Sequence, residues 1–170
     1  MPKWTGTTTV PFPTDQIDLE AWLYNMSDQE YQRTARQHKA LGVFAQDGVR
    51  GMVNVEIMGH ALLIQHYHDV TAGKSDLELY SERSRAYLFH IVPVTVQVRW
   101  TMSVTTLGGN DSSFSCTVDT TMPPVINFLA QATGVLWAIR RHVAEETIGY
   151  AADLTRKLQA KATRIAPDRA

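Results

Sequence analysis

Two histidines separated by one residue are the side chains of this sequence best suited to acid–base chemistry. They are His66 and His68, in the stretch QHYHD. Imidazole exchanges protons near neutral pH and also binds metal ions. Residues two apart on a β-strand face the same side, so both rings could address one ligand. The alternative is a structural role, in which they hydrogen-bond to the backbone or to Tyr67 and Asp69.

The direction in which the two histidines point depends on the turn MGH at 58–60. A two-residue turn places both imidazoles on the same side of the hairpin as Val53, Val55 and Ile57. A three-residue turn would reverse this arrangement. We take the apolar side as the inner one, so we expect both histidines to point into the protein.

A metal site is not expected at this pair. A site of two histidines and one carboxylate needs Asp or Glu aimed at the same point. Glu56 has the opposite parity on its strand, and Asp69 points away from both imidazoles. Asn54 and Glu56 are interpreted as part of a solvated outer face. The sequence therefore predicts no metal and no cofactor.

A third histidine lies on a predicted helix, in RRHVAEE at 140–146. His142 precedes Glu146 by four residues, a spacing that allows a shared metal or a salt-linked pair. We interpret the pair as a solvent-exposed, charge-paired helix face.

Composition limits the functions that the chain can have. It has 170 residues, 44% of them hydrophobic, and a formal net charge of -1. This charge gives no support to a nucleic-acid partner, and no apolar run is long enough to span a membrane. The single cysteine, Cys116, excludes an internal disulfide, is interpreted as a small buried hydrophobe, and favours a cytoplasmic setting. We expect one domain over residues 1–170, with a tail that frays from about 162.

The predicted elements begin with a short strand over 5–10 and two short helices. Ser27 and Glu30 form a capping-box pattern, so the second helix should run from about Asp28 to about Leu41. About five antiparallel strands follow, beginning at Val49.

The last predicted strands and the C-terminal helix supply the apolar surfaces. One long strand is expected to bend at Pro93, and the loop LGGNDSS should form a hairpin. The helix should run from about 125 to about 161, and its first half is apolar on nearly every side. The strand over 94–104 alternates apolar and polar residues, and the helix over 125–139 is apolar on nearly every side. We therefore expect both Trp100 and Trp137 to be largely buried.

This order of elements resembles the START/Bet v 1-like superfamily, which includes polyketide cyclases, aromatases, lipid and steroid carriers and plant hormone receptors. The resemblance covers residues from about 5 to about 160 and rests on element order, not on a sharp motif. It implies an α+β helix-grip fold, in which a curved antiparallel sheet of about six strands surrounds the long helix and leaves an apolar cavity. No functional residue transfers by motif. The rival is the cone-shaped sheet of ketosteroid isomerase, but the long terminal helix argues against it.

The leading hypothesis is a protein that binds a small apolar or aromatic ligand, such as a polyketide, steroid or lipid. His66 and His68 are the candidate catalytic groups, with Tyr80, Tyr87 and His90 as polar helpers. An enzyme of this kind would be a cofactor-free cyclase, dehydratase or isomerase. The expected cavity is lined by Val96, Val98, Trp100, Met102, Leu129, Thr133 and Trp137.

Two alternatives remain open at this stage. One is a carrier or sensor that binds a hydrophobic ligand without chemistry. The other is a homodimer whose apolar surplus covers a subunit interface and whose core is solid.

Overall fold

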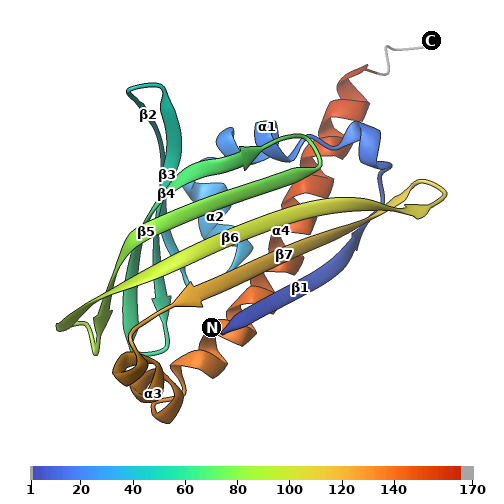
Figure 1. Ribbon diagram of the computed structural model, residues 1–170. Coiled ribbons are helices and arrows are strands. Elements are labelled where there is room, and N and C mark those ends of the chain that lie inside the picture. Colours follow the sequence, from blue (N-terminus) through green and yellow to red (C-terminus); the bar gives the residue numbers. More distant parts are fainter. Residues whose placement is uncertain (1, 166–170) are drawn as a thin grey trace.

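The computed structural model describes residues 2–165 (Figure 1). Helix α4 continues to the end of this range, so residues 162–165 belong to it, and the rest of the expected frayed tail lies outside the described residues. The elements, in chain order, are β1 (Lys3–Val10), η1 (Thr14–Gln16), α1 (Leu19–Tyr24), α2 (Asp28–Thr34), β2 (His38–Gln46), β3 (Val49–Met58), β4 (Ala61–Ala72), β5 (Asp76–Leu88), β6 (Val92–Gly108), β7 (Asp111–Thr121), α3 (Pro124–Ala132) and α4 (Val135–Ile165).

The strands form one antiparallel sheet with the order β1-β7-β6-β5-β4-β3-β2. Figure 1 shows the sheet curving around α4, which crosses its concave side, while α1 and α2 lie near the end formed by β2 and β3. The predicted α+β class is therefore confirmed. Among the described residues, no helix combines the length and apolarity needed to cross a bilayer.

Strand β2 is the element that the sequence analysis missed. The capping box of Ser27 and Glu30 is present and starts α2 as expected, but the helix ends at Thr34 instead of continuing to about Leu41. The following residues pair with β3 from His38 onward. Local propensity favoured a longer helix, and pairing with the exposed edge of β3 outweighs it. The sheet accordingly has seven strands.

The predicted continuous C-terminal helix is broken between α3 and α4. Gly134 has a φ of +77°, a left-handed conformation that glycine adopts without steric cost. The break turns α3 away from the sheet, so Val125, Phe128 and Leu129 are exposed and only Ala130 of this helix is buried. Trp100 is 2% exposed as expected, but Trp137 is 65% exposed, and the prediction of its burial is wrong.

The strand expected to bend at Pro93 is instead two strands joined by a tight turn. Strand β5 ends at Leu88 and β6 begins at Val92. Phe89 and His90 in the turn both have positive φ values. The hairpin predicted at LGGNDSS joins β6 to β7.

Helix α4 approaches α2 closely because Gly149 lies where the two helices meet. A Cβ atom on Gly149 would lie 1.9 Å from the backbone oxygen of Thr34 in α2, so a larger residue cannot fit there. This close contact fixes the position of α2 along the axis of α4. It brings the start of β2 next to the middle of the long helix.

Candidate functional site

The hairpin of β3 and β4 has the predicted two-residue turn but faces the opposite way. Met58 pairs with Ala61, and Val53 pairs with His66, so the relative register was correct. However, His66 is exposed and His68 is half-buried on the outer side of the sheet. His68 contacts Tyr80 there, with ring centroids 5.8 Å apart. The expectation that both imidazoles point inward is wrong.

The inner face of the same hairpin carries the polar residues that we had placed in solvent. Asn54, Glu56 and Gln65 are each at most 5% exposed, between Met52, Met58 and Leu63. Val53, Val55 and Ile57 of β3 occupy the outer face and are only half-buried. Valine and isoleucine suit a pleated surface on either face, so they did not mark the core.

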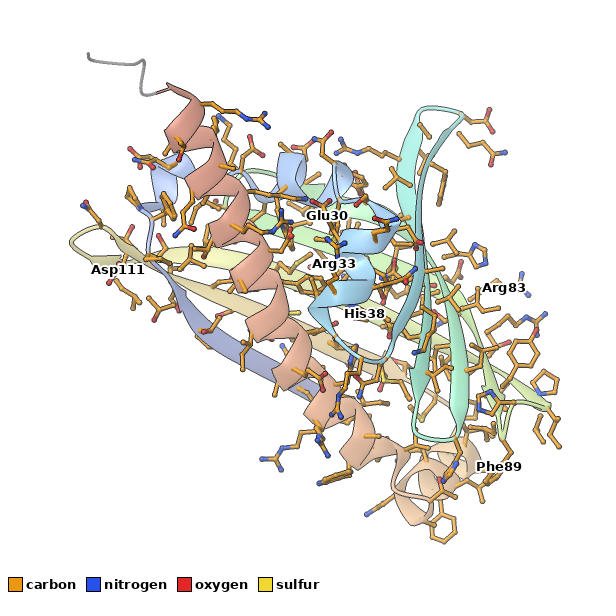
Figure 2. All side chains as sticks on the ribbon, turned by 180° about the vertical axis from the view of Figure 1, so that it is seen from behind. Glu30, Arg33, His38, Arg83, Phe89 and Asp111 are labelled. Atoms are coloured by element: carbon orange, nitrogen blue, oxygen red, sulfur yellow. The ribbon has the colours of Figure 1, made fainter. Side chains whose placement is uncertain are left out.

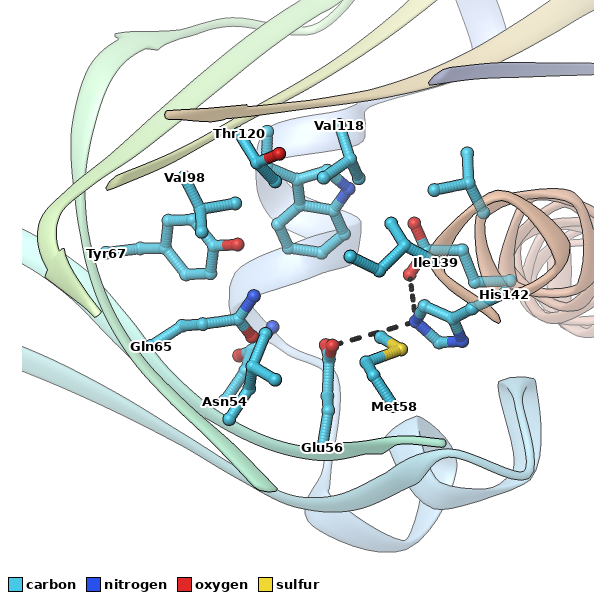
Figure 3. Close-up of a pocket in the computed structure, with 14 residues that line it drawn as sticks. Asn54, Glu56, Met58, Gln65, Tyr67, Val98, Val118, Thr120, Ile139 and His142 are labelled. Atoms are coloured by element: carbon cyan, nitrogen blue, oxygen red, sulfur yellow. Dashed lines mark ion pairs between the residues drawn. The ribbon is translucent and has the colours of Figure 1, made fainter. Parts of the chain in front are cut away.

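Helix α4 presents a second buried polar pair to this face. His142 is 2% exposed and Glu146 is 3% exposed, so the interpretation of a solvated helix face is wrong. His142 contacts both Glu146 of its own helix and Glu56 of β3. Figure 3 shows the side chains of His142 and Glu56 pointing toward each other. The helix positions the pair because Ile139 and Val143 lie on the same side and pack into the core.

These side chains form what we call the His–Glu cluster, which consists of His38, Glu56, His142 and Glu146. The Nε2 atom of His142 lies 3.2 Å from Oε2 of Glu146 and 3.7 Å from Oε2 of Glu56. The Nε2 atom of His38 lies 3.5 Å from Oε2 of Glu146. Strands β2 and β3 and helix α4 therefore each contribute to one buried polar centre.

Neighbouring residues hold the cluster from outside. The Tyr31 hydroxyl donates to Oε1 of Glu56 at 2.6 Å, and the Tyr31 ring stacks on His38 with centroids 3.8 Å apart. The Cys116 thiol donates to Oε1 of Glu146 at 3.3 Å. Cys116 is fully buried as predicted, and burial raises the pKa of its thiol, which therefore remains protonated.

The cluster perturbs the proton affinities of its members. Burial alone would lower the pKa of His142, but the carboxylates of Glu146 and Glu56 outweigh burial and raise it above its usual value. Burial likewise opposes ionisation of Glu146, but His142 and His38 lower its pKa. At neutral pH, His142 and Glu146 thus favour a buried ion pair.

A small cavity lies against the cluster, between the sheet and α4 (Figure 3). About 30 Å³ of it is accessible to the centres of water molecules, which is room for about two waters. Its walls come from β3, β4, β6, β7 and α4. They include Asn54, Glu56, Met58, Leu63, Gln65, Tyr67, Val98, Trp100, Val118, Thr120, Ile139, His142, Val143 and Glu146.

Several polar atoms in the cavity wall have no hydrogen-bond partner among the described residues. They are Oδ1 of Asn54, Oε1 of Gln65 and Oγ1 of Thr120. A buried polar group without a partner costs free energy. Such groups are usually found where a ligand or ordered water binds.

The predicted cavity residues divide between sheet and helix. Val96, Val98, Trp100 and Met102 are buried on the inner face, and Val98 and Trp100 line the cavity. On the helical side, Leu129, Thr133 and Trp137 are exposed, because the break at Gly134 turns this part of the chain outward. The helical wall is formed instead by Ile139, His142, Val143 and Glu146 of α4.

The predicted polar helpers also lie away from the cavity. Tyr80 is half-buried on the outer face, where the Arg99 guanidinium lies 4.9 Å from its ring centroid. Tyr87 is half-buried, and His90 is exposed in the β5–β6 turn. None of the three is among the residues that line the cavity.

Sequence reasoning missed all four members of the His–Glu cluster as a group. For His142 and Glu146 a signal was available, because both lie on the helix stripe that carries Ile139 and Val143. For His38 there was none, since the strand that holds it was predicted as a helix. Glu56 was missed because its hairpin was predicted to face the opposite way.

Solved structures with the same architecture show which fold this is. A protein from Thermus thermophilus superimposes with a TM-score of 0.60 at 13% identity, covering 92% of this chain and 99% of its own. The Zhui aromatase/cyclase from a Streptomyces species gives 0.59 at 10% identity, covering 95% of each chain. This chain has the helix-grip fold.

A START superfamily protein from Mycobacterium smegmatis shares the helix-grip fold with it, at a TM-score of 0.54 and 10% identity over 94% of this chain and 98% of the other. No protein-family model and no curated protein matches the sequence. At these identities the likeness establishes the helix-grip fold alone. The resemblance stated from element order is thereby confirmed for the fold.

Proposed function

We propose that this helix-grip protein binds a small, largely apolar ligand that carries hydroxyl or carbonyl groups. The observation that supports this most is the set of unpartnered polar atoms of Asn54, Gln65 and Thr120, which stand among apolar cavity walls. Ligand sites are mostly apolar, with a few polar groups that fix the orientation of the ligand. A hydroxylated aromatic compound meets both requirements.

The aromatase/cyclase from Streptomyces supports a polyketide-like compound as the ligand class, since it shares the fold. The cavity must widen to admit such a molecule, because it now holds only about two waters' worth of space, about 30 Å³. Met58 and Ile139 border the cavity, and the thioether chain of methionine adopts new rotamers at little cost. We expect these side chains to move when the ligand enters.

Thermal unfolding in the presence of 2-naphthol, with naphthalene as the matched probe without a hydroxyl, tests the proposal. A tenfold excess over the dissociation constant should stabilise the protein by about 1.4 kcal/mol. 2-Naphthol should raise the melting temperature more than naphthalene does, and Val118→Phe, which fills the cavity, should abolish both shifts.

Thr133→Trp is the control, because Thr133 is exposed and outside the cavity wall. It should leave the shifts unchanged. Loss of the shifts in Thr133→Trp with their retention in Val118→Phe would contradict the proposal and place binding on the helix face first expected from the sequence.

A second candidate function is cofactor-free proton transfer on the bound ligand, as in a cyclase, dehydratase or isomerase. It is favoured by the position of Glu56 and His142 in the cavity wall. General acids and bases contribute about 10²–10⁴-fold to rate. His142→Gln should then lower turnover of a β-polyketone substrate by about 100-fold, while 2-naphthol still raises the melting temperature. An unchanged rate would exclude proton transfer by His142 and favour a carrier that performs no chemistry.

Further expectations concern organisation and setting. We propose that the protein acts in the cytoplasm, on the basis of its single buried cysteine, and that it forms one domain. A homodimer stays a prediction, and the exposed Val125, Phe128 and Trp137 are the apolar side chains that it would cover.

A further inference from the structure

The His–Glu cluster brings together four atoms of the kinds that bind transition metals. His38, Glu56, His142 and Glu146 each offer one nitrogen or oxygen, and these atoms all lie within 4.8 Å of one another. All four residues are buried, and no solvent-exposed carboxylate takes part. Imidazole nitrogens and carboxylate oxygens together are typical ligands of zinc and of other divalent first-row metals.

The hydrogen bonds of His38 involve its Nδ1 atom and leave Nε2 directed at the cluster. Its Nδ1 lies 2.9 Å from the backbone oxygen of Tyr31 and 2.9 Å from Oγ1 of Thr34. The Thr34 hydroxyl already donates to the same backbone oxygen, and a carbonyl can only accept. Nδ1 of His38 therefore donates to this outer group, and Nε2 is the ring nitrogen that faces the cluster, as in metal-binding histidines.

The two carboxylates are held in the same manner. Tyr31 binds Oε1 of Glu56 and Cys116 binds Oε1 of Glu146, while Oε2 of each glutamate faces the imidazoles. An outer hydrogen bond and an inner free oxygen are the usual arrangement around a bound metal. Each of these three ligands is thus oriented by a neighbour that does not itself enter the cluster.

The ring nitrogens that face the cluster make no well-aligned hydrogen bond among the described residues. Nε2 of His38 and Nε2 of His142 make only ion-pair contacts with the carboxylates. Three of the six separations between inner atoms are 3.2, 3.5 and 3.7 Å, near the roughly 3.3 Å edge of a tetrahedron whose ligands stand about 2.0–2.1 Å from a zinc ion. All six are within 4.8 Å, so the side chains would draw together around the ion. A metal ion would displace the proton that His142 holds in its ion pair. Two carboxylates and two neutral imidazoles would then together offset the charge of a divalent cation.

We propose that His38, Glu56, His142 and Glu146 bind one divalent transition-metal ion, with Zn²⁺ as the best-fitting ion. The proposal departs from the expectation of no metal and no cofactor, which weighed the histidines of β4 and the His142–Glu146 pair separately and did not bring the four cluster residues together. Glu56, His142 and Glu146 also line the cavity, so the ion would stand at its wall. The metal site does not depend on the proposed organic ligand. It is an alternative to cofactor-free proton transfer, because Glu56 and His142 cannot exchange protons with a ligand through the atoms that bind a metal.

The test is metal content and metal titration of the whole protein, first stripped with a chelator and with no organic ligand added. One equivalent of Zn²⁺ should bind and raise the melting temperature. Co²⁺ should bind to the unmodified protein with the visible absorption bands of four-coordinate cobalt. The cobalt spectrum needs no variant, so it stands even if substitutions in the cluster prevent folding.

His142→Gln and His38→Gln should each weaken Zn²⁺ binding by at least tenfold. His66→Gln is the matched control, because His66 lies on the outer face, and it should bind Zn²⁺ as the unmodified protein does. No uptake of Zn²⁺ or Co²⁺, or equal loss in His66→Gln, would overturn the metal site and leave a metal-free ion-paired core. The naphthol experiment would stand in either case.

Discussion

The two ends of the interface between α4 and the sheet are built on different principles. Toward the C-terminal end of α4, Tyr150 and Leu154 pack with Trp22 and Phe114 in a core without unpartnered groups other than the Tyr150 hydroxyl, within residues 2–165. Trp22 and Phe114 meet edge to face, with centroids 6.3 Å apart. We call this the solid end.

One and two turns earlier in α4 lies what we call the polar end, which consists of the His–Glu cluster and the cavity. There the helix presents His142 and Glu146 to Glu56, beside polar atoms that have no partner among the described residues. Buried polar and charged groups of this kind stabilise the fold less than apolar side chains of the same volume would. The solid end therefore supplies the stability that allows the polar end to be specialised for binding.

The largest expected effect is at the solid end. Phe114 is fully buried, so Phe114→Ala should lower the free energy of unfolding by about 3–5 kcal/mol through lost burial and the resulting cavity. Urea denaturation measures the change.

Leu129→Ala is the companion variant, since Leu129 is exposed although the sequence predicted it in the cavity wall. It should change stability by less than about 0.5 kcal/mol. Comparable losses in the two variants would mean that α3 packs on the sheet, and the division into two ends would be wrong.

A smaller effect is expected from the charged residues that fasten α2 to the solid end. Glu30 (labelled in Figure 2) contacts Arg156 and Lys157 of α4. Burial acts against ionisation, but the Ser27 backbone N–H, Lys157 and Arg156 prevail and lower the pKa of Glu30 from 4.5 to about 2. Because the folded pKa is the lower one, this stabilisation is complete above pH 4.5 and is lost as the pH falls toward about 2.

Glu30→Gln should therefore cost on the order of 1 kcal/mol at neutral pH, given partial solvent screening, and almost nothing near pH 2. Glutamine preserves the capping box, so the variant removes the charge alone. Denaturation at a series of pH values follows the difference, and a difference that does not vary with pH would exclude the ion pairs as its source.

The smallest effect should come from the polar end. Thr120→Val removes a buried hydroxyl that has no partner among the described residues, with little change in shape. Stability should stay the same or rise by up to about 1 kcal/mol.

Ser112→Ala is the control on the same strand at the solid end. The Ser112 hydroxyl donates to the Phe12 backbone oxygen at 2.7 Å, so its loss should cost about 1–3 kcal/mol. If Thr120→Val destabilises as much as Ser112→Ala, Thr120 has a structural partner and the polar end is not preformed for a ligand.

The same division explains what the sequence could predict. The strand alternation of β6 correctly placed Val96, Val98, Trp100 and Met102, because one face there is uniformly apolar. In β3 and β4 the buried face carries Asn54, Glu56 and Gln65, so hydrophobic patterning indicated the wrong side. Functional sites are where local rules fail, and the failure here falls on the candidate site.

Two further errors came from the backbone and not from the side-chain pattern. Gly134 breaks a stretch whose apolar residues favoured one long helix, which moved the helical cavity wall away from Leu129, Thr133 and Trp137. The edge strand β2 depends on pairing with β3, which is a tertiary contact. The position of His38 therefore could not follow from local sequence.

The central claim is that a ligand binds at the polar end and not at the solid end or on the outer face. Methyl-labelled NMR during a titration with 2-naphthol tests it most directly. The methyl signals of Val98, Val118, Ile139 and Val143 should shift as the ligand is added, while those of Leu19, Leu23 and Leu154 stay in place. Shifts confined to the leucines, or to Val53 and Val55 beside His66 on the outer face, would contradict the account.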